Sequence, residues 1–130
     1  MTQRILQPAG FKRPEGYALG IEASGRLVFT AGLIGWDETE TIVSDDFVEQ
    51  FRRALENVVA VLREADAGPE HVVRLTCYLT DKQTYLSRRK EVGAAYRAVM
   101  GRHFPAMAFV EVSALMEDRA LVEIEATAVV

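Results

Sequence analysis

The sequence predicts a single α+β domain in which two helices cover one face of a mixed β-sheet. The chain has 130 residues, 49% of them hydrophobic, and segments of strand and of helical periodicity alternate along it. A domain of this size buries about two-thirds of its unfolded-chain surface, which is enough for a stable core. No repeat, linker or low-complexity tract divides the sequence, so residues 1–130 are expected to form one domain.

The first part of the chain predicts short strands. A short opening strand is expected at residues 4–7. Residues 20–31 (GIEASGRLVFTA) predict two more strands around a turn at Ser24-Gly25, because serine and glycine favour turns between alternating segments. Over the whole chain the expected order is β-β-α-β-α-β-β, preceded by the opening strand.

The clearest helix begins after Asp46. Asp46 is a predicted N-cap, and Glu49 would complete a capping box. Apolar residues at spacings of four, four, three and four form one stripe along this helix: Phe47, Phe51, Leu55, Val58 and Leu62. Gly68 followed by Pro69 predicts the helix end, because glycine caps helices and proline does not continue them.

The rest of the chain predicts one more helix and three strands. Residues 73–79 alternate between apolar and polar side chains, with Val73, Leu75, Cys77 and Leu79 on the apolar side. Residues 84–100 predict the second helix, and Gly101 its end. Residues 106–112 and 121–129 predict the last two strands.

The faces of these strands predict burial between subunits. Two helices cover only one face of such a sheet. Alternation places Met107, Phe109 and Glu111 on one side of their strand, and Glu123 and Glu125 on one side of the last strand. A face that mixes large apolar side chains with carboxylates is poor solvent surface and poor core. We expect its apolar groups to pack across an oligomer interface, while the acids line a pocket or central channel.

Charge, hydropathy and cysteine content argue against several classes of function. The net charge is −4 and the pI about 5.2, whereas nucleic-acid binders carry a basic face that neutralises phosphates. We therefore expect no nucleic-acid partner. The apolar runs are far too short to span a membrane, and the start lacks a signal-peptide block, so no membrane partner and a cytoplasmic location are expected. The lone Cys77 is interpreted as a packed thiol rather than a nucleophile.

Metal and cofactor chemistry find little support in the sequence. The two histidines, His71 and His103, lie in unrelated segments without the spacing of a zinc site. The glycines form neither a dinucleotide-binding loop nor a P-loop. We expect no metal and no cofactor.

Segments spread over nearly the whole chain resemble the RidA/YjgF family. The most specific are residues 104–112 (FPAMAFVEV) and 121–128 (LVEIEATA) near the end of the chain. Other segments match earlier motifs of the family in the same order: Gly16-Tyr17 with Gly20, then residues 29–34 (FTAGLI), 54–58 (ALENV), 72–76 (VVRLT) and 78–81 (YLTD). The chain is identified as a divergent member of this family.

The resemblance implies a chorismate-mutase-like fold and a homotrimer with a central β-barrel-like core and a cleft at each subunit boundary. The best-known members hydrolyse enamines and imines and release ammonia. Glu123 matches the carboxylate that holds the hydrolytic water, a role that suits a carboxylate in a partly desolvated cleft. The alternative is that Glu123 is a structural acid, like Glu125.

Four more residues are candidates for substrate binding because they match family positions around the cleft. Tyr17 matches a residue that reaches into the neighbouring subunit's pocket, although a tyrosine that simply packs is the alternative. Gly32 matches a position where a backbone group approaches the ligand, and Ile34 ends the same segment. Ala31 replaces a serine of deaminating relatives, which removes one hydroxyl.

Met107 is the main departure from the family. There an arginine grips the substrate carboxylate through two charged hydrogen bonds, and losing about 3 kcal/mol lowers affinity about 100-fold. Methionine offers only a soft apolar surface, and Phe109 adds bulk, so both are expected to line an apolar pocket floor. Trp36 is either a further aromatic wall or a cover for the core. Arg102 and Arg119 are candidates for supplying, from another position, the positive charge that Met107 lacks.

The sequence therefore predicts a homotrimeric hydrolase that deaminates an enamine or imine other than a simple 2-imino acid. A larger or ring-cleavage-type amino acid, as in aminomuconate deaminase relatives, fits the apolar floor. The alternative is a non-catalytic trimer that binds a small apolar or aromatic metabolite at the subunit clefts, and Ala31 and Met107 both favour it. A third function, RNA cleavage, is supported only by the endoribonuclease label that some relatives carry.

Overall fold

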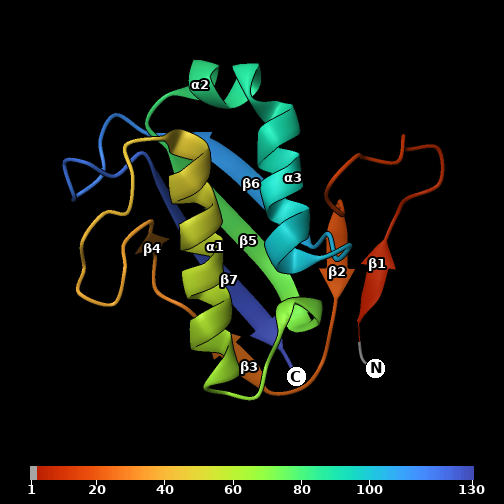
Figure 1. Cartoon of the computed structure of the whole chain (residues 1–130). Coiled ribbons are helices and arrows are strands. Elements are labelled where there is room, and N and C mark those ends of the chain that lie inside the picture. Colours follow the sequence, from red (N-terminus) through yellow and green to blue (C-terminus); the bar gives the residue numbers. More distant parts are fainter. Residues whose placement is uncertain (1–2) are drawn as a thin grey trace.

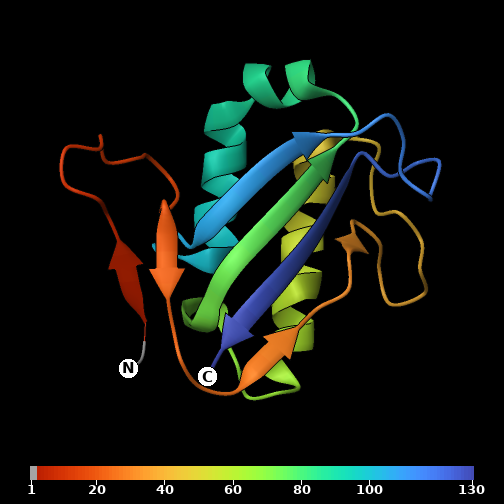
Figure 2. The same cartoon turned by 180° about the vertical axis from the view of Figure 1, so that it is seen from behind.

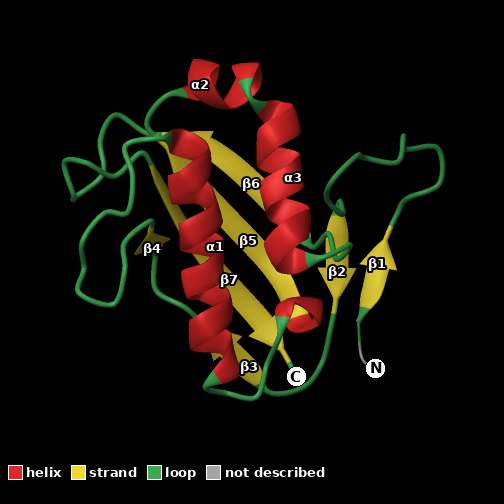
Figure 3. Ribbon diagram, viewed as in Figure 1, coloured by secondary structure: helices red, strands yellow, loops and turns green. Residues whose placement is uncertain are grey.

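The computed structural model describes residues 3–130, and it confirms a mixed sheet with its helices on one face (Figures 1 and 3). The main sheet has the strand order β3-β7-β5-β6, and β4 also pairs with β7. β5 and β6 are parallel, whereas β7 is antiparallel to all its partners. The strands are β3 (Leu27–Phe29), β4 (Leu33–Ile34), β5 (Val72–Leu79), β6 (Ala106–Glu111) and β7 (Val122–Val129).

The predicted opening strand is present, but its pairing separates it from the main sheet. β1 (Arg4–Leu6) and β2 (Gly20–Glu22) form a two-stranded sheet of their own. The strands on either side of Ser24-Gly25 therefore do not pair with each other, because β2 pairs with β1 and β3 with β7. Gly25 has a φ of +145°, and a Cβ there would meet the carbonyl oxygen of Val130 at 2.5 Å. The turn thus depends on a glycine.

Helix α1 (Phe47–Arg63) begins as predicted and ends earlier. The Asp46 side chain accepts the N–H of Glu49 at 3.0 Å, which confirms the N-cap. The capping box was wrong in its second half, because the Asp46 N–H is bound to Ser44 Oγ at 3.0 Å. The predicted end at Gly68 was also wrong: the chain leaves the helix through Asp66, whose φ is 56°, before the 3₁₀ turn η1 (Pro69–His71).

The single second helix of the prediction is two helices, α2 (Lys82–Ser87) and α3 (Arg89–Met100). Asp81 caps α2 by accepting the N–H of Gln83, which moves the start two residues toward the N-terminus. Arg88 leaves helical geometry between the two helices, at φ −125° and ψ 26°. Its guanidinium binds Asp46 at the start of α1 and Glu91 in α3, which ties the break to α1.

The core lies between the sheet and helices α1 and α3. The α1 stripe is buried as predicted, and it packs against inward side chains of β5 and β7. Val73 was predicted on the apolar side of its strand, but the register shifts between Val72 and Arg74. Val72 takes the core position there, and Val73 is only half-buried. Leu75, Cys77 and Leu79 are buried as predicted.

Met107 and Phe109 lie on the helix-covered face, which corrects the predicted mixed face. Met107 pairs with Leu75 and Phe109 with Cys77, and paired residues share a face. Both side chains pack against the core under the helices. Alternation within β6 shows which of its residues share a side, but it does not show which side faces the helices. That depends on how β6 is paired with the neighbouring strand.

The opposite face of the sheet carries no helix, as Figure 2 shows, and we call it the open face. Glu123 and Glu125 of β7 lie on it, as predicted. Its large apolar side chains are Leu27, Phe29 and Val110, which are 59%, 66% and 41% exposed. A face that mixes carboxylates with large apolar side chains therefore exists, but its apolar residues are not the predicted Met107 and Phe109. No helix among residues 3–130 is both long enough and apolar enough to cross a membrane.

Candidate functional site

Glu123 lies half-buried on β7, beside the segment that joins β3 and β4. A Cβ placed on Gly32 would lie 2.2 Å from Oε2 of Glu123, so the glycine backbone lies directly against the carboxylate. The absence of a side chain at residue 32 is what lets the carboxylate take this position. The structure thus brings together the predicted catalytic residue and one predicted binding residue.

Ala31 and Gly32 are exposed because the chain bulges there. Residues 29–33 span four steps against three steps of β7, from Phe29 opposite Thr127 to Leu33 opposite Ile124. Thr30 fixes the bulge, since it exchanges two hydrogen bonds of 3.0 Å with the backbone of Ala126. Its hydroxyl also donates to the carbonyl of Ala31 at 2.8 Å.

The side chain of Ile34 is 6% exposed and packs in a small second cluster with Ile42 and Ala120. Its carbonyl accepts a hydrogen bond of 2.9 Å from Asn57. Trp36 packs against the same cluster, which agrees with a covering role. Neither residue lies with Tyr17 or Met107.

Glu125, two residues from Glu123, has a partner of its own on the open face. The hydroxyl of Tyr78 donates a hydrogen bond of 2.6 Å to Oε1 of Glu125. This bond to a carboxylate raises the pKa of Tyr78 above its ordinary value. Glu125 is therefore a structural acid within the protomer, whereas the Glu123 carboxylate lies beside an exposed glycine.

The other predicted binding residues line a groove between α3 and β6, which we call the α3–β6 groove. Its volume is about 680 Å³, and Tyr17, Met107 and Phe109 are among its lining residues. The ring of Phe109 lies 4.8 Å from that of Tyr85 and 6.2 Å from that of Phe51, measured between centroids. The floor is apolar and aromatic, as expected from Met107 and Phe109.

Tyr17 reaches this groove because the chain beside it docks against the start of β6. Ala18 forms a parallel bridge with Ala106, and its N–H donates to the carbonyl of Pro105 at 3.0 Å. The Tyr17 side chain is left 43% exposed. Behind it, the rings of Tyr96 and Phe104 stack at 5.4 Å.

Residues of α3 that the sequence analysis did not single out also line the groove. Arg89, Gly93 and Arg97 recur at intervals of four, which places them on one side of the helix. The same spacing in the sequence could have identified them.

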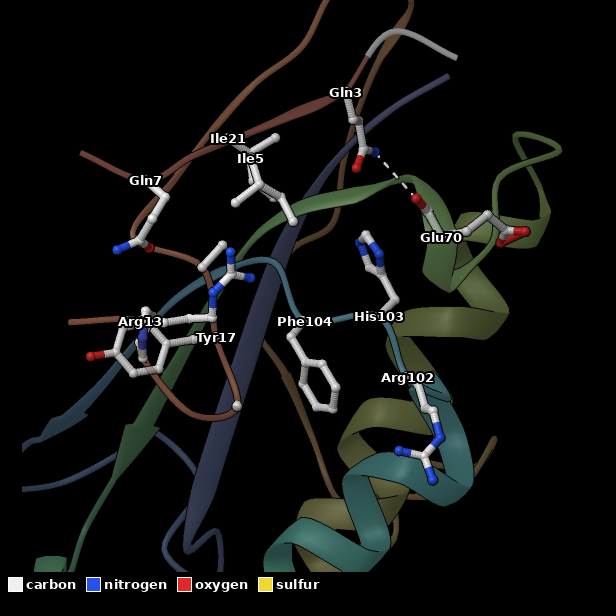
Figure 4. A pocket seen from close by; sticks show the side chains of 13 residues that line it. Gln3, Ile5, Gln7, Arg13, Tyr17, Ile21, Glu70, Arg102, His103 and Phe104 are labelled. Carbon is white, nitrogen blue, oxygen red and sulfur yellow. Dashed lines mark hydrogen bonds between the residues drawn. The ribbon is translucent and has the colours of Figure 1, made fainter. Parts of the chain in front are cut away.

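Neither candidate for supplying the positive charge that Met107 lacks lines the α3–β6 groove. Arg119 binds Asp45 at 2.8 Å in a loop on the other side of α1. Arg102 lines a neighbouring pocket of about 480 Å³ that also contains Tyr17 and His103. Figure 4 shows Arg102 and Tyr17 on different sides of that pocket.

The histidines and Cys77 have structural partners. His103 Nε2 donates to the carbonyl of Val72 at 2.6 Å, and His71 Nδ1 accepts the N–H of Gly68 at 2.9 Å. Burial raises the pKa of Cys77, so its thiol stays protonated. Within residues 3–130 no three His, Cys, Asp or Glu side chains gather in a way that could hold a metal ion.

The candidate residues thus form two groups on opposite faces of one sheet. Glu123, Ala31 and Gly32 lie at the open face, whereas Met107 and Phe109 line the groove on the helix side. Strand β5 separates β7 from β6. Within one protomer the sheet therefore lies between the two groups.

Comparison with known proteins places the chain in one family. The family model described as Endoribonuclease L-PSP matches residues 11–130. A RutC family protein of Synechocystis is 41% identical, with 99% of this chain and 98% of the relative covered. The 2-iminobutanoate/2-iminopropanoate deaminase of Salmonella typhimurium is 34% identical, with 87% of this chain and 86% of the relative covered.

A solved structure agrees over the full length. It is a protein of unknown function of the conserved Rid family, YyfB from Yersinia pestis, with a TM-score of 0.84 and 31% identity over 100% of both chains. The fold, the family model and these relatives together show that the chain belongs to the RidA/YjgF family.

Proposed function

We propose that this chain is a hydrolase of small metabolites that releases ammonia from an enamine or imine other than a simple 2-imino acid. The observation that carries the proposal is the Glu123 carboxylate lying directly against the exposed backbone of Gly32. A carboxylate at an exposed backbone position can accept a proton from water and return it to a substrate nitrogen. The deaminase relative from Salmonella supports the reaction class.

In the proposed reaction, Glu123 accepts a proton from water as the oxygen attacks the imine carbon. The same proton is then given to the nitrogen, which completes a carbinolamine. Glu123 next moves the proton of the new hydroxyl to the nitrogen, the C–N bond breaks, and the products are a carbonyl compound and ammonia. General acid–base catalysis of this kind contributes about 10²- to 10⁴-fold. Every step uses water and one carboxylate, so the proposal needs neither metal nor cofactor.

The proposal includes a homotrimer with the active site between subunits. Its support is the separation of the candidate residues: one protomer offers Glu123 on the open face, and a neighbour would offer Tyr17 and Met107 from its groove. The exposed Leu27 and Phe29 on the open face favour burial against another copy. A cytoplasmic location belongs to the same proposal and stays a prediction.

The apolar floor supports a substrate that differs from the simple 2-imino acids. The resemblance places an arginine where this chain has Met107, which packs against the core at the base of an aromatic groove. Methionine cannot pair with a carboxylate, so a ligand held at this position needs apolar surface.

Ammonia release from freshly generated 2-aminoacrylate, 2-iminobutyrate and a series of larger imines tests the proposal. Glu123→Gln should abolish release, and Glu64→Gln, the same change at the exposed end of α1, should leave it unchanged. Met107→Arg should gain activity on the simple 2-imino acids. Unchanged turnover in Glu123→Gln would remove the assigned role.

A second candidate function is binding without catalysis. The aromatic lining of the α3–β6 groove favours it, because such a surface holds an apolar or aromatic metabolite without chemistry. If no imine releases ammonia with either wild type or Met107→Arg, this function replaces the first. RNA cleavage, which the name of the family model suggests, is not favoured by a net charge of −4.

A further inference from the structure

The α3–β6 groove has a cationic wall opposite its aromatic floor. Arg89, Lys90 and Arg97 of α3 all line it, and Glu15 is the one carboxylate among its lining residues. Three positive charges against one negative charge make the groove attractive to an anion. The aromatic floor is Tyr85, Phe109 and Phe51, with Met107 beside them.

These three cations have no charged or hydrogen-bonding side-chain partner in the part of the chain that the structure describes. With residues 3–130 taken together, none of them forms an ion pair or a side-chain hydrogen bond. Other arginines do: Arg53 binds Glu38 at 2.7 Å, and Arg119 binds Asp45 at 2.8 Å. The charges along the groove are therefore available to a ligand.

Arg97 lies at the end of the groove where Met107 is found. Helix α3 runs into β6 through a short connection, so the last turns of α3 lie beside the first residues of β6. Arg97 is in the last turn of α3, and Met107 is the second residue of β6. Arg89 is the first residue of α3 and therefore lies at the other end of the helix.

Gly93 keeps the wall of the groove open. A Cβ at this position would meet Nη1 of Arg97 at 3.3 Å, so the guanidinium extends over the glycine. Glycine in a helix interior lowers stability relative to alanine, and here it leaves space that a side chain would fill. The guanidinium can therefore reach a ligand that lies on the aromatic floor.

We infer that Arg97 takes over the anchoring of the substrate carboxylate, and that the ligand class of this site is an aromatic 2-imino or 2-oxo acid. Guanidinium and carboxylate pair through two charged hydrogen bonds, and the ring of the ligand packs on Phe109 and Tyr85. A volume of about 680 Å³ is generous for a three-carbon acid and suits an aromatic one. The inference rests on the proposed function in taking this groove as part of the substrate site.

Calorimetric titration with three probes tests the inference. Phenylpyruvate has the ring and the carboxylate, pyruvate lacks the ring, and phenylacetone lacks the carboxylate. Phenylpyruvate should bind at least about tenfold more tightly than either of the others, because only it uses both the wall and the floor. Its affinity should fall with added salt, whereas that of phenylacetone should not.

Substitutions then test whether Arg97 is the residue that binds the carboxylate of the probe. Arg97→Gln should weaken phenylpyruvate about tenfold to 100-fold and leave phenylacetone unchanged. Arg63→Gln, which changes another last-turn arginine on α1, should alter neither. Gly93→Leu should abolish binding of both aromatic probes, and the helix should tolerate it because leucine is a better helix former than glycine.

The outcomes separate this inference from the proposed function. Equal affinity of wild type and Arg97→Gln for phenylpyruvate would overturn the inference, as would a loss seen only in Arg89→Gln. If the hydrolysis of small imines depends on Glu123 and is unchanged in Arg97→Gln, the proposed function is supported and the role of Arg97 is overturned. Binding of phenylpyruvate that depends on Arg97, without ammonia release from any imine, would support the inference and overturn the hydrolase.

Discussion

The hydroxyl of Tyr78 lies 2.6 Å from Oε1 of Glu125, so a side-chain hydrogen bond joins the two central strands on the open face. The carboxylate accepts this bond and holds the phenol in its protonated form, which raises the pKa of Tyr78. A group whose pKa is higher in the folded state stabilises the fold below its unfolded pKa, here about 10. That contribution disappears as the pH rises through the folded pKa.

We therefore expect Tyr78→Phe to unfold at a lower temperature than wild type at pH 8. The difference should shrink above about pH 10, because the phenol of the unfolded chain then ionises while the hydrogen-bonded phenol of the folded protein stays protonated to a higher pH. Tyr17→Phe is the control, since the Tyr17 hydroxyl has no hydrogen-bond partner in the chain from residue 3 onward. A difference that stays constant between pH 8 and pH 11 in thermal unfolding would contradict this assignment.

Gly32→Ala should reduce turnover on the order of 100-fold, because the new Cβ would displace the Glu123 carboxylate. Gly20→Ala is a matched control, since a Cβ there would make only ordinary contact with Leu6 at 3.5 Å. Steady-state kinetics on the best substrate should show the loss in kcat. If Gly32→Ala retained full kcat, Glu123 would not act from the position seen here.

Phe29→Glu should convert the proposed trimer into monomers. The Phe29 ring is 66% exposed on the open face, and a charge buried there between subunits would lack a partner. Phe11→Glu is the control, because Phe11 has a similar exposure of 64% and lies between β1 and β2, outside the strands of the main sheet. Light scattering would give the mass of each variant, and a monomeric wild type would contradict the assembly itself.

Asp46 allows two contributions at the start of α1 to be separated. Asp46→Asn should keep the N-cap and lose the ion pair with Arg88, whereas Asp46→Ala should lose both. Loss of the cap alone costs about 1 kcal/mol of unfolding free energy at pH 7. Denaturant unfolding of the two variants measures the difference.

The ion pair should also depend on pH. The Arg88 guanidinium, followed by the Glu49 N–H, lowers the pKa of Asp46. The stability from this carboxylate is then present above its unfolded pKa of about 3.9 and is lost as the pH falls through the lower folded pKa. The difference between wild type and Asp46→Asn should therefore be full at pH 7 and absent once Asp46 is protonated.

Much of the fold could be predicted because its periodicities are local. The α1 stripe, the cap at Asp46 and the inward side chains of β5 each depend on neighbours a few residues away. The prediction failed where a distant contact decides the local geometry. The helix breaks at Arg88, where the guanidinium forms an ion pair with Asp46 of a distant segment. Val73 leaves the core position because the register of β5 against β7 shifts beside it.

The site was predictable residue by residue and not as an arrangement. The resemblance singled out Glu123, Gly32, Tyr17 and Met107, and the structure places the first two in contact. Which face Met107 occupies depends on the register of β6 against β5, and no periodicity within β6 contains that information. The cations of α3 did not predict a site, because a charged helix face is usually only solvated.

The position of β7 has a consequence for how the chain is made. Residues 122–129 form β7, the strand that joins β3 and β4 to β5. The main sheet therefore remains in separate pieces until residues 122–129 have left the ribosome. Earlier segments can form α1 and the β5–α2–α3–β6 unit, but with one side of β5 unpaired. A chain cut before Val122 should expose that edge and aggregate rather than fold.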